Sequence, residues 1–435
     1  IVFLGLAAAL FGHWLEKAGP RKAGVAAAIF WGGGLMVTSL GVSLHQLWLI
    51  WLGAGVIGGI GLGLGYISPV STLIKWFPDR RGLATGMAIM GFGGGAMIGM
   101  PLGDYLIKAN GVGETFFIMG LIYLIAMTIG AFGYRVPAEG WKPEGWNPVA
   151  KKTNNMISSS HVHVSNAHKT PQFWLLWGVL CLNVSAGIGV LSVAKPMFQE
   201  IAASSFDPLI IGAIATGFGA LLSLANIIGR IFWASSSDFL GRKLTYAIFF
   251  SLGTALYLAA PWAGINQYIA TFVLITLVIL TMYGGGFATI PAYLADIFGT
   301  QHVGAIHGRL LTAWSLAGIV GPMLISYLRE YQLSMGIPTD QAYNSSFKIL
   351  ALLLVAGFIL NLLVKPVNKK FGMTPAELKA EQGALKGTQT NSSVVASVTN
   401  TSMQKILLPL AWIVVGVPIT LGILNALQKG IIIFL

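Results

Sequence analysis

The stretch GHWLEKAGPRK at 12–22 recurs in altered form as WASSSDFLGRK at 233–243. In both copies an acidic residue stands three positions before a glycine, and a basic pair closes the motif at the end of an apolar run. The matched positions are Glu16 with Asp238, Gly19 with Gly241, and Arg21-Lys22 with Arg242-Lys243. Parallel internal repeats are common in membrane proteins that are built from two halves, so the motif predicts two equivalent halves.

The composition indicates that both copies lie in a membrane protein. Of 435 residues, 55% are hydrophobic and 9% are charged, whereas soluble domains carry about 25% charged residues. Apolar stretches of about 20 residues cross a bilayer as helices. We expect about twelve of them, at 1–14, 24–43, 47–74, 83–107, 115–134, 172–194, 209–234, 245–264, 267–297, 304–328, 347–364 and 406–427. The sequence therefore predicts an all-α polytopic protein embedded in the lipid bilayer.

The formal net charge of +12 is explained by membrane topology. If the loop after run 1–14 faces the cytoplasm and the sides alternate, most lysines and arginines fall in cytoplasmic loops, as the positive-inside rule requires. No folded soluble module carries the charge, so we expect no nucleic-acid partner. The chain begins without a basic segment followed by a cleavage site, and the sequence therefore predicts no signal peptide.

A polar segment at 135–170 divides the apolar runs into two groups. We expect an N-terminal helical bundle at 1–134 and a C-terminal bundle at 171–365, joined by this central cytoplasmic loop. A second polar segment, 366–405, contains a tract rich in Ser, Thr and Asn, a composition typical of disordered linkers. It leads to an additional transmembrane helix at 406–427.

The repeated motif resembles the short loop of the major facilitator superfamily, which joins helices two and three and again helices eight and nine. The resemblance implies two pseudo-symmetric six-helix bundles around a central cavity, which opens alternately to the two sides by rocking of the bundles. It makes run 1–14 the second family helix, so the bundle at 1–134 holds family helices 2–6 and the bundle at 171–365 holds helices 7–12. On this interpretation the first helix is missing and the helix at 406–427 is extra.

Five further stretches resemble one branch of that superfamily, the oxalate–formate antiporter family. They are GYISPVSTLIKWFPDRRGLATGMAIMGFGGGA (65–96), PAEGWKPEGWNP (137–148), KTPQFWLLW (169–177), NIIGR (226–230) and YLADIFGTQHVGAIHGRLLTAWSLAGIVGP (293–322). The resemblance covers about the first 370 residues. It implies secondary transport of small organic anions, by exchange or together with protons.

Arg230 lies inside an apolar run, eight residues before Asp238. At about 1.5 Å per helical residue it lies roughly 12 Å in from the cytoplasmic edge, close to the bilayer midplane. The equivalent position in the first copy is Ala8, so this type of helix does not require the charge. A charge at that depth normally faces a cavity and meets a partner or substrate, and arginine binds carboxylates through two parallel hydrogen bonds. Asn226 shares its helix face and is expected to orient the guanidinium or to hold a substrate group; the alternative is that Arg230 reaches the headgroups or pairs with another helix.

The family resemblance supplies the rest of the expected substrate site. Oxalate carriers of the family have a lysine on the eleventh helix, where this sequence has Trp314. One fixed cation in place of two favours a monocarboxylate such as lactate, formate or pyruvate over the dianion oxalate, with oxalate–formate exchange as the alternative. The resemblance also implies aromatic walls formed by Tyr66, Phe92, Tyr283 and Phe287.

Two further roles are expected of charged residues. Glu16 with Arg21, and Asp238 with Arg242, would brace the cytoplasmic closure of each half without touching the substrate. A coupled proton has three candidate carriers, each of which is also interpretable as a structural residue: Asp296, His302 and His307.

Other classes of function find little support in the sequence. GAGVIG (53–58) matches a dinucleotide fingerprint, which needs a preceding strand and a polar helix after it, whereas here both sides are apolar. Neither the loop histidines His161, His163 and His168 nor the single Cys181 has the neighbours of a metal site, so no metal or cofactor is expected. HExxH, GxSxG and paired intramembrane carboxylates are absent, and an enzyme is not expected. A non-transporting carboxylate sensor is the alternative from a different class; the expected location is a bacterial inner membrane.

Overall fold

The computed structural model describes residues 1–137, 141–143, 156–158 and 160–380, with short pieces between 417 and 433. Within this part of the chain the regular structure is helical, apart from one isolated antiparallel bridge between Val162 and Gly372. The elements are α1 Val2–Ala18, α2 Pro20–Ser43, α3 Leu47–Ile50, the π-helical η1 Trp51–Ile57, α4 Gly58–Trp76, α5 Arg81–Gly133, α6 Val164–Ala167, α7 Pro171–Ser192, α8 Ala194–Ile201, α9 Ile211–Leu240, α10 Arg242–Ile265, α11 Ile269–Phe298, α12 Val303–Leu310, α13 Thr312–Ser334, η3 Thr339–Gln341, α14 Asn344–Leu363 and η4 Lys369–Phe371. The additional helix expected at 406–427 falls mostly outside the described residues.

The long helices have the length and composition of membrane spans. Nine helical stretches in the described part of the chain are long and apolar enough to cross a membrane, and the prediction of an all-α polytopic membrane protein is confirmed. Two of the expected apolar runs, 83–107 and 115–134, lie in α5 except for the last residue of the second run, and the α5 backbone leaves helical geometry at Gly111 (φ 82°, ψ 173°). The two spans therefore meet at that glycine. The fingerprint-like stretch at 53–58 lies in η1 and the start of α4, between helices on both sides.

The repeated motif forms the same turn in both halves. Gly19 separates α1 from α2 with φ 83°, and Gly241 separates α9 from α10 with φ 87°, a conformation that only glycine adopts without strain. The next helix then begins on Pro20 in the first half and on Arg242 in the second. The match of Arg21 with Arg242 is therefore wrong by one residue, because the glycine turn, and not the basic pair, sets the register.

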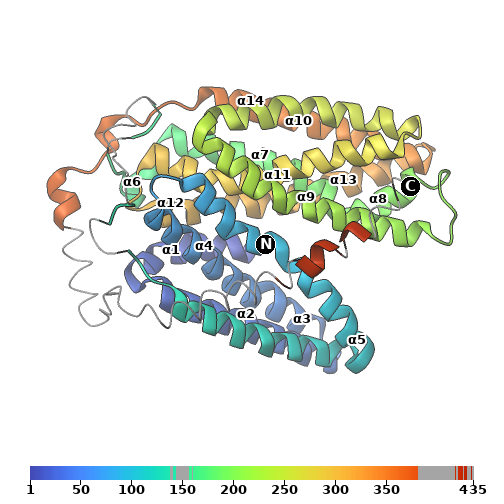
Figure 1. Cartoon of the computed structure of the whole chain (residues 1–435), viewed down its shortest axis with the longest axis horizontal. Coiled ribbons are helices and arrows are strands. Elements are labelled where there is room, and N and C mark those ends of the chain that lie inside the picture. The colour runs from blue at the N-terminus through green and yellow to red at the C-terminus, as the bar shows by residue number, and fades with distance from the viewer. Residues whose placement is uncertain are drawn as a thin grey trace.

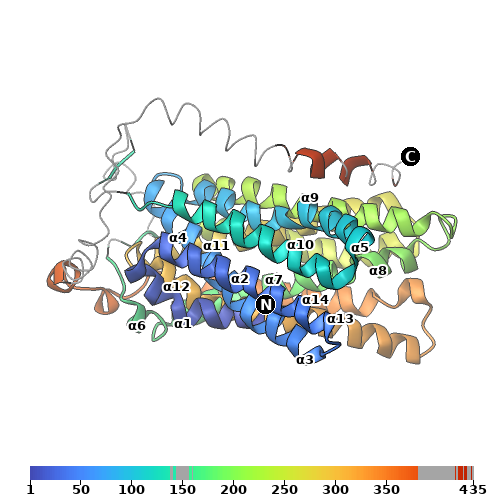
Figure 2. The same ribbon diagram turned by 90° about the horizontal axis from the view of Figure 1, so that it is seen from below.

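The two halves meet along two seams. Figures 1 and 2 show α1–α5, coloured blue to teal, and α7–α14, coloured green to orange, running along the same long axis. The α1–α12 seam joins the halves at one place and the α5–α9 seam at another. Each seam depends on glycine for close approach: a Cβ at Gly308 would lie 2.2 Å from the Ala8 carbonyl oxygen, and one at Gly86 would lie 2.6 Å from the Arg230 carbonyl oxygen.

The described end of the central loop, residues 160–170, packs against the second half. Val162 and Val164 are buried. The backbone N–H of Val162 donates to the Phe298 carbonyl at 2.9 Å, and Arg309 Nη1 donates to the Val164 carbonyl at 2.8 Å. This part of the polar segment is therefore docked on the helices, because the valines that alternate with its histidines supply apolar side chains that burial stabilises.

Candidate functional site

Arg230 lies buried between the two halves, with 3% of its surface exposed. Its Nε donates to Asn226 Oδ1 at 3.0 Å, within α9, and its Nη1 donates to the Ile89 carbonyl of α5 at 2.9 Å. The guanidinium carbon lies 5.4 Å from the ring centre of Phe287 on α11, a cation–π distance. Asn226 is therefore placed to orient the guanidinium, and the arginine itself bridges the α5–α9 seam.

Arg230 differs from the other buried cation in what it pairs with. Two arginines and no lysine are buried in the described chain, Arg230 and Arg242. Arg242 forms ion pairs with Asp238 and Asp296, whereas no carboxylate pairs with Arg230 among the described residues, and its Nη2 has no hydrogen-bond partner there. Because buried charges are normally paired, Arg230 has unused capacity for an anion. Its burial does not fit the alternative that it reaches the headgroups.

An aromatic cluster from both halves lies beside the guanidinium and reaches it through Phe287. Tyr66 of α4 lies at its centre, with ring-centre distances of 5.8 Å to Phe92, 5.4 Å to Phe287, 5.9 Å to Trp314 and 5.7 Å to His307. Phe287 and Trp314 are closer still, at 4.5 Å and edge to face. Four of the five aromatic residues expected in the site thus contact one another, and one of them, Phe287, lies against Arg230.

Tyr283, the fifth expected aromatic residue, lies one turn before Phe287 on α11. It is buried against α7, where a Cβ at Gly187 would lie 2.4 Å from its ring. Tyr283 shares α11 with Phe287, whose ring lies 5.4 Å from the Arg230 guanidinium carbon. It is not among the ring pairs of the cluster.

Several polar groups of the cluster have no hydrogen-bond partner in the described chain. They are the Tyr66 hydroxyl, the Trp314 indole N–H and both ring nitrogens of His307. Asn183 Oδ1 of α7 is in the same state, beside Gly286. Such groups are uncommon in folded proteins, and each calls for an explanation such as a ligand or a water molecule. Sequence reasoning missed Asn183, a polar residue in an apolar stretch like Arg230, and gave His307 no contact with substrate.

The Asp238 closure lies at the end of the α5–α9 seam. The Asp238 carboxylate accepts the backbone N–H groups of Gly82 at 2.9 Å and Leu83 at 3.0 Å, at the start of α5. It also pairs with Arg242 at 2.5 Å. Negative charge is favourable at a helix N-terminus. The Asp238 carboxylate of the second half therefore binds the start of α5 in the first half both through these hydrogen bonds and through the helix dipole.

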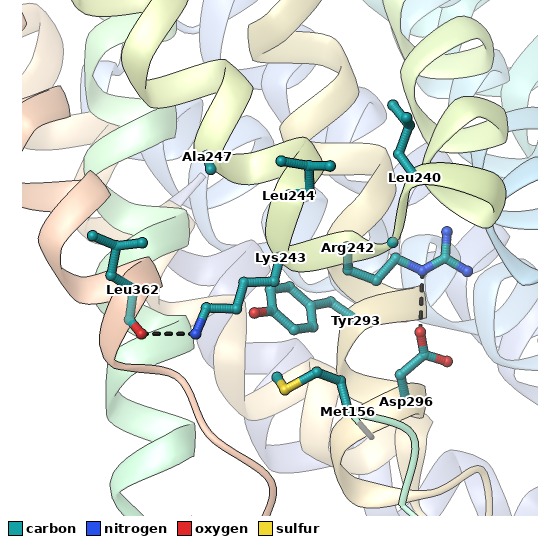
Figure 3. A pocket seen from close by; sticks show the side chains of 10 residues that line it. Met156, Leu240, Arg242, Lys243, Leu244, Ala247, Tyr293, Asp296 and Leu362 are labelled. Carbon is teal, nitrogen blue, oxygen red and sulfur yellow. Dashed lines mark hydrogen bonds and ion pairs between the residues drawn. The ribbon is translucent and has the colours of Figure 1, made fainter. Parts of the chain in front are cut away.

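Asp296 of α11 extends this closure. It pairs with Arg242 at 3.2 Å and with Arg81 of α5 at 3.1 Å. Figure 3 shows the Arg242–Asp296 pair beside a pocket of about 340 Å³ that Tyr293, Lys243 and Met156 also line. The Lys243 side chain points away from Arg242 and donates to the Leu362 carbonyl at 2.7 Å. The cations of this pocket are therefore already occupied, and the pocket does not include Arg230.

The Glu16 closure lies at the end of the α1–α12 seam and is built differently. The Glu16 carboxylate accepts the backbone N–H of Ala305 at 3.0 Å, at the start of α12, and lies 3.2 Å from His302 Nδ1. Arg21 lies over the Phe132 ring at 5.8 Å, and no ion pair joins it to Glu16 in the described chain. The expected Glu16–Arg21 brace is absent there because Pro20 occupies the helix start that Arg242 occupies in the other half.

The three loop histidines turn to three different partners. His161 Nδ1 accepts the Gln301 N–H at 3.3 Å, and His168 Nδ1 lies 3.0 Å from Arg309 Nη1. The His163 ring lies edge-on to His302, with 4.8 Å between ring centres. Burial, reinforced by His302 and Arg81, lowers the pKa of His161 below its ordinary value. These histidines do not form a joint site.

Two repeated helical halves meet around an arginine that is buried and pairs with no carboxylate among the described residues, an arrangement typical of multi-pass membrane transporters. The Major Facilitator Superfamily model matches residues 1–222 and 184–433, and the chain belongs to that superfamily. The crystal structure of the fucose:proton symporter of E. coli aligns with a TM-score of 0.60 at 12% identity, over 84% of this chain and 89% of that one. The expected superfamily and fold are confirmed.

Curated relatives add a second similarity. The chain is 26% identical to the oxalate:formate antiporter of Oxalobacter formigenes, over 84% of this chain and 82% of the relative. It is 25% identical to apicoplast pyruvate carrier 1 of Toxoplasma gondii, over 74% of this chain and 66% of the relative. The expected likeness to oxalate–formate antiporters is confirmed.

Proposed function

We propose that the protein is a secondary active transporter of small organic anions, with monocarboxylates such as lactate, formate or pyruvate as its preferred substrates, in a bacterial inner membrane. Membership of the superfamily supports transport by alternating access, and the similarity to an oxalate:formate antiporter and a pyruvate carrier supports a small carboxylate substrate. The substrate site is formed by Arg230, Asn226, Tyr66, Phe92, Tyr283, Phe287 and Trp314.

The single observation that carries this proposal is the burial of Arg230 without a carboxylate partner in the described chain. Asn226 and the Ile89 carbonyl hold Nε and Nη1, which leaves Nη2 for a ligand. A carboxylate there would meet a charge already removed from water, where charge-assisted hydrogen bonds are strongest. The unpartnered Tyr66 hydroxyl and Trp314 N–H offer further donors in the same cluster.

Preference for a monoanion follows from the count of charges. Trp314 packs at 4.5 Å on Phe287 and is buried, so the place where the family resemblance puts a lysine holds an apolar ring. A dianion would bring a second negative charge into this low-dielectric cluster with one cation to meet it. Oxalate–formate exchange is the second candidate, and the similarity to the Oxalobacter antiporter supports it.

Alternating access would open one end of the seams and close the other. Glu16 and Asp238 each hold the first helical turn of an element in the opposite half, α12 and α5 respectively. Release of these carboxylates would let the two halves separate at that end. Among the candidate proton carriers, Asp296 is engaged with two arginines and His302 with Glu16, while His307 lies in the aromatic cluster.

Uptake by proteoliposomes tests the proposal. The purified chain is reconstituted, and entry of labelled lactate is measured with competing unlabelled lactate, formate, pyruvate or oxalate outside. Saturable uptake that monocarboxylates inhibit more strongly than oxalate is the expected result. Uptake driven by an inward proton gradient identifies symport, and uptake that needs internal anion identifies exchange. Stronger inhibition by oxalate would favour the second candidate, and binding without any flux would overturn transport in favour of a sensor.

A further inference from the structure

Three side chains that can each bind a metal ion meet at the Glu16 closure. His13 and Glu16 lie on α1, and His302 directly precedes α12. One ligand atom from each of the three, two imidazole nitrogens and a carboxylate oxygen, lie within 4.8 Å of one another. His302 is 3% exposed, and the Glu16 side chain is 10% exposed. A compact, largely buried group of this kind differs from a set of surface side chains that meet by chance.

The sequence and the seam position these groups independently. His13 and Glu16 are three residues apart, so they project from one face of α1. The Ala305 N–H, which donates to Glu16 at 3.0 Å, fixes the start of α12 and with it the preceding His302. Gly12 and Gly304 keep the approach close, since a Cβ at Gly304 would lie 3.2 Å from Glu16 Oε1. The three ligands therefore come from two halves of the molecule but from fixed positions on each.

Two histidines and one glutamate form a recognised ligand set for zinc, which binds imidazole nitrogen and carboxylate oxygen at about 2.0–2.2 Å. Ligands that share one ion are then about 3–4 Å apart, so a small contraction of the cluster suffices. Calcium and magnesium prefer sites made of oxygen ligands, and imidazole favours zinc and its neighbours in the transition series. The chemistry of the donors thus selects a transition-metal ion.

The other half of the repeat shows that closure does not need histidine. Asp238 performs the equivalent task with Arg242 and the backbone N–H groups of α5. At the α5–α9 seam Arg242 thus neutralises the Asp238 carboxylate. At the α1–α12 seam the Glu16 carboxylate lies beside two imidazoles instead. An imidazole pair accepts a metal ion, which arginine does not.

We propose that His13, Glu16 and His302 bind a divalent transition-metal ion such as Zn²⁺, and that the bound ion links α1 to α12 and holds the Glu16 closure shut. The binding part stands on the geometry alone. The locking part rests on the proposed transport function, because a link between the halves stops movement only in a protein whose halves separate.

Cobalt(II) reports on the site directly. The purified full chain, freed of any affinity tag and of metal, is titrated with Co²⁺, which gives an intense visible absorption when a protein holds it in four-coordinate geometry. The expected result is one Co²⁺ per chain, displaced by Zn²⁺. His13→Ala, at a half-buried position, should weaken binding at least about tenfold, and Glu16→Gln likewise. The matched control is His45→Ala, an exposed histidine in the turn after α2, which should bind as the parent does.

Absence of the absorption, or an equal response of His13→Ala and His45→Ala, would overturn the metal site. Uptake then tests the lock: micromolar Zn²⁺ should inhibit the parent and the His45 variant, and inhibition should be lost in the His13 variant. Metal binding by a protein whose uptake is insensitive to Zn²⁺ would overturn the lock. A chain that binds Co²⁺ at the cluster but transports no anion under any condition would refute the proposed function and leave the metal site standing.

Discussion

Ala8 and Arg230 hold equivalent places in the two seams, and each carbonyl oxygen lies against a glycine of the opposite half, Gly308 for Ala8 and Gly86 for Arg230. The backbones thus obey one design. The side chains do not, since Ala8 contributes a methyl group where Arg230 brings a guanidinium into the centre of the protein. Duplication of a helical motif fixes how helices approach, whereas a change at one position decides which seam recognises an anion.

The same contrast holds at the ends of the seams. Asp238 is held by arginine and two backbone N–H groups, and Glu16 by one backbone N–H and an imidazole. Arginine stays charged at all physiological pH values, whereas histidine changes charge near neutrality. We therefore expect the α5–α9 seam to be the stronger and less condition-dependent of the two.

The largest effect is expected from the substitution that makes the two seams alike at their centre. Arg230→Gln should lower uptake at least about 100-fold. Removal of one charge from a buried ion pair costs about 3–5 kcal/mol, and the bound carboxylate would lose its cationic partner. Arg230→Lys should also lower uptake severely, since a single ammonium cannot hold both Asn226 Oδ1 and the Ile89 carbonyl and also present a fixed donor to the substrate. Arg80→Lys is the matched control, an exposed arginine that directly precedes α5 in the opposite half. Normal uptake by the Arg230→Lys protein would contradict the anchor role.

The second prediction concerns two substitutions that each remove the carboxylate charge from one closure. Asp238→Asn should cost about 3 kcal/mol, because it leaves buried Arg242 with half of its carboxylate partners. Glu16→Gln keeps an oxygen for the Ala305 N–H and should cost about 1 kcal/mol. Thermal unfolding of the detergent-solubilised proteins measures the difference. Equal losses in the two variants would show that the seams do not differ in strength.

Parts of this contrast that depend on regular helix geometry were predictable from the sequence, whereas parts that depend on the register of a turn were not. The contact between Arg230 and Asn226 followed from helix geometry alone, because residues four positions apart in a helix lie on the same face. The register of Arg21 did not follow, since one proline displaced the basic pair relative to the glycine turn. The basic pair was visible in the sequence, but its backbone geometry was not.

The Glu16 closure was beyond sequence reasoning for a different reason. Glu16 and His302 are separated by 286 positions, and no local pattern connects them. Packing of α1 on α12 brings them together, and that packing depends on glycines whose spacing resembles many others in this glycine-rich chain. The docking of 160–170 was hidden likewise, because two buried valines outweighed a polar composition.

The third prediction compares the backbones of the seams. Gly308→Ala and Gly86→Ala place a methyl group 2.2 Å and 2.6 Å from carbonyl oxygens across the α1–α12 and α5–α9 seams. Each should destabilise the protein by about 1–3 kcal/mol through overpacking, with the greater loss at Gly308. Gly219→Ala on α9, where nothing lies within 4 Å of the added carbon, is the control. A smaller loss at Gly308 than at Gly219 would mean that the first seam is not closely packed.

The fourth prediction adds a cation beside Arg230. Trp314→Lys introduces an ammonium near Tyr66 and Phe287, which a second carboxylate would pair with. The ratio of oxalate to lactate uptake should rise about tenfold, equivalent to about 1.4 kcal/mol. Trp314→Gln removes the ring without adding charge and should leave the ratio near that of the parent. The same rise in both variants would assign selectivity to the size of the cavity and not to its charge.

The smallest expected effect concerns the pH dependence of the Glu16 side. The lowered pKa of His161, caused mainly by burial, means that the folded protein favours the neutral ring. The stability that results is present above the unfolded pKa of about 6.5 and is lost as the pH falls through that value towards the folded pKa. His161→Asn retains an acceptor for the Gln301 N–H but does not titrate. Between about pH 8 and pH 5, the parent should therefore lose slightly more thermal stability than the variant, by less than about 1 kcal/mol because the ring is half-buried.

Asp238 is held by arginine and backbone groups that do not titrate in this range, so Asp238→Asn should change overall stability without changing this pH response. A parent and a His161→Asn protein with identical pH profiles would show that the docked loop contributes nothing to the difference between the seams.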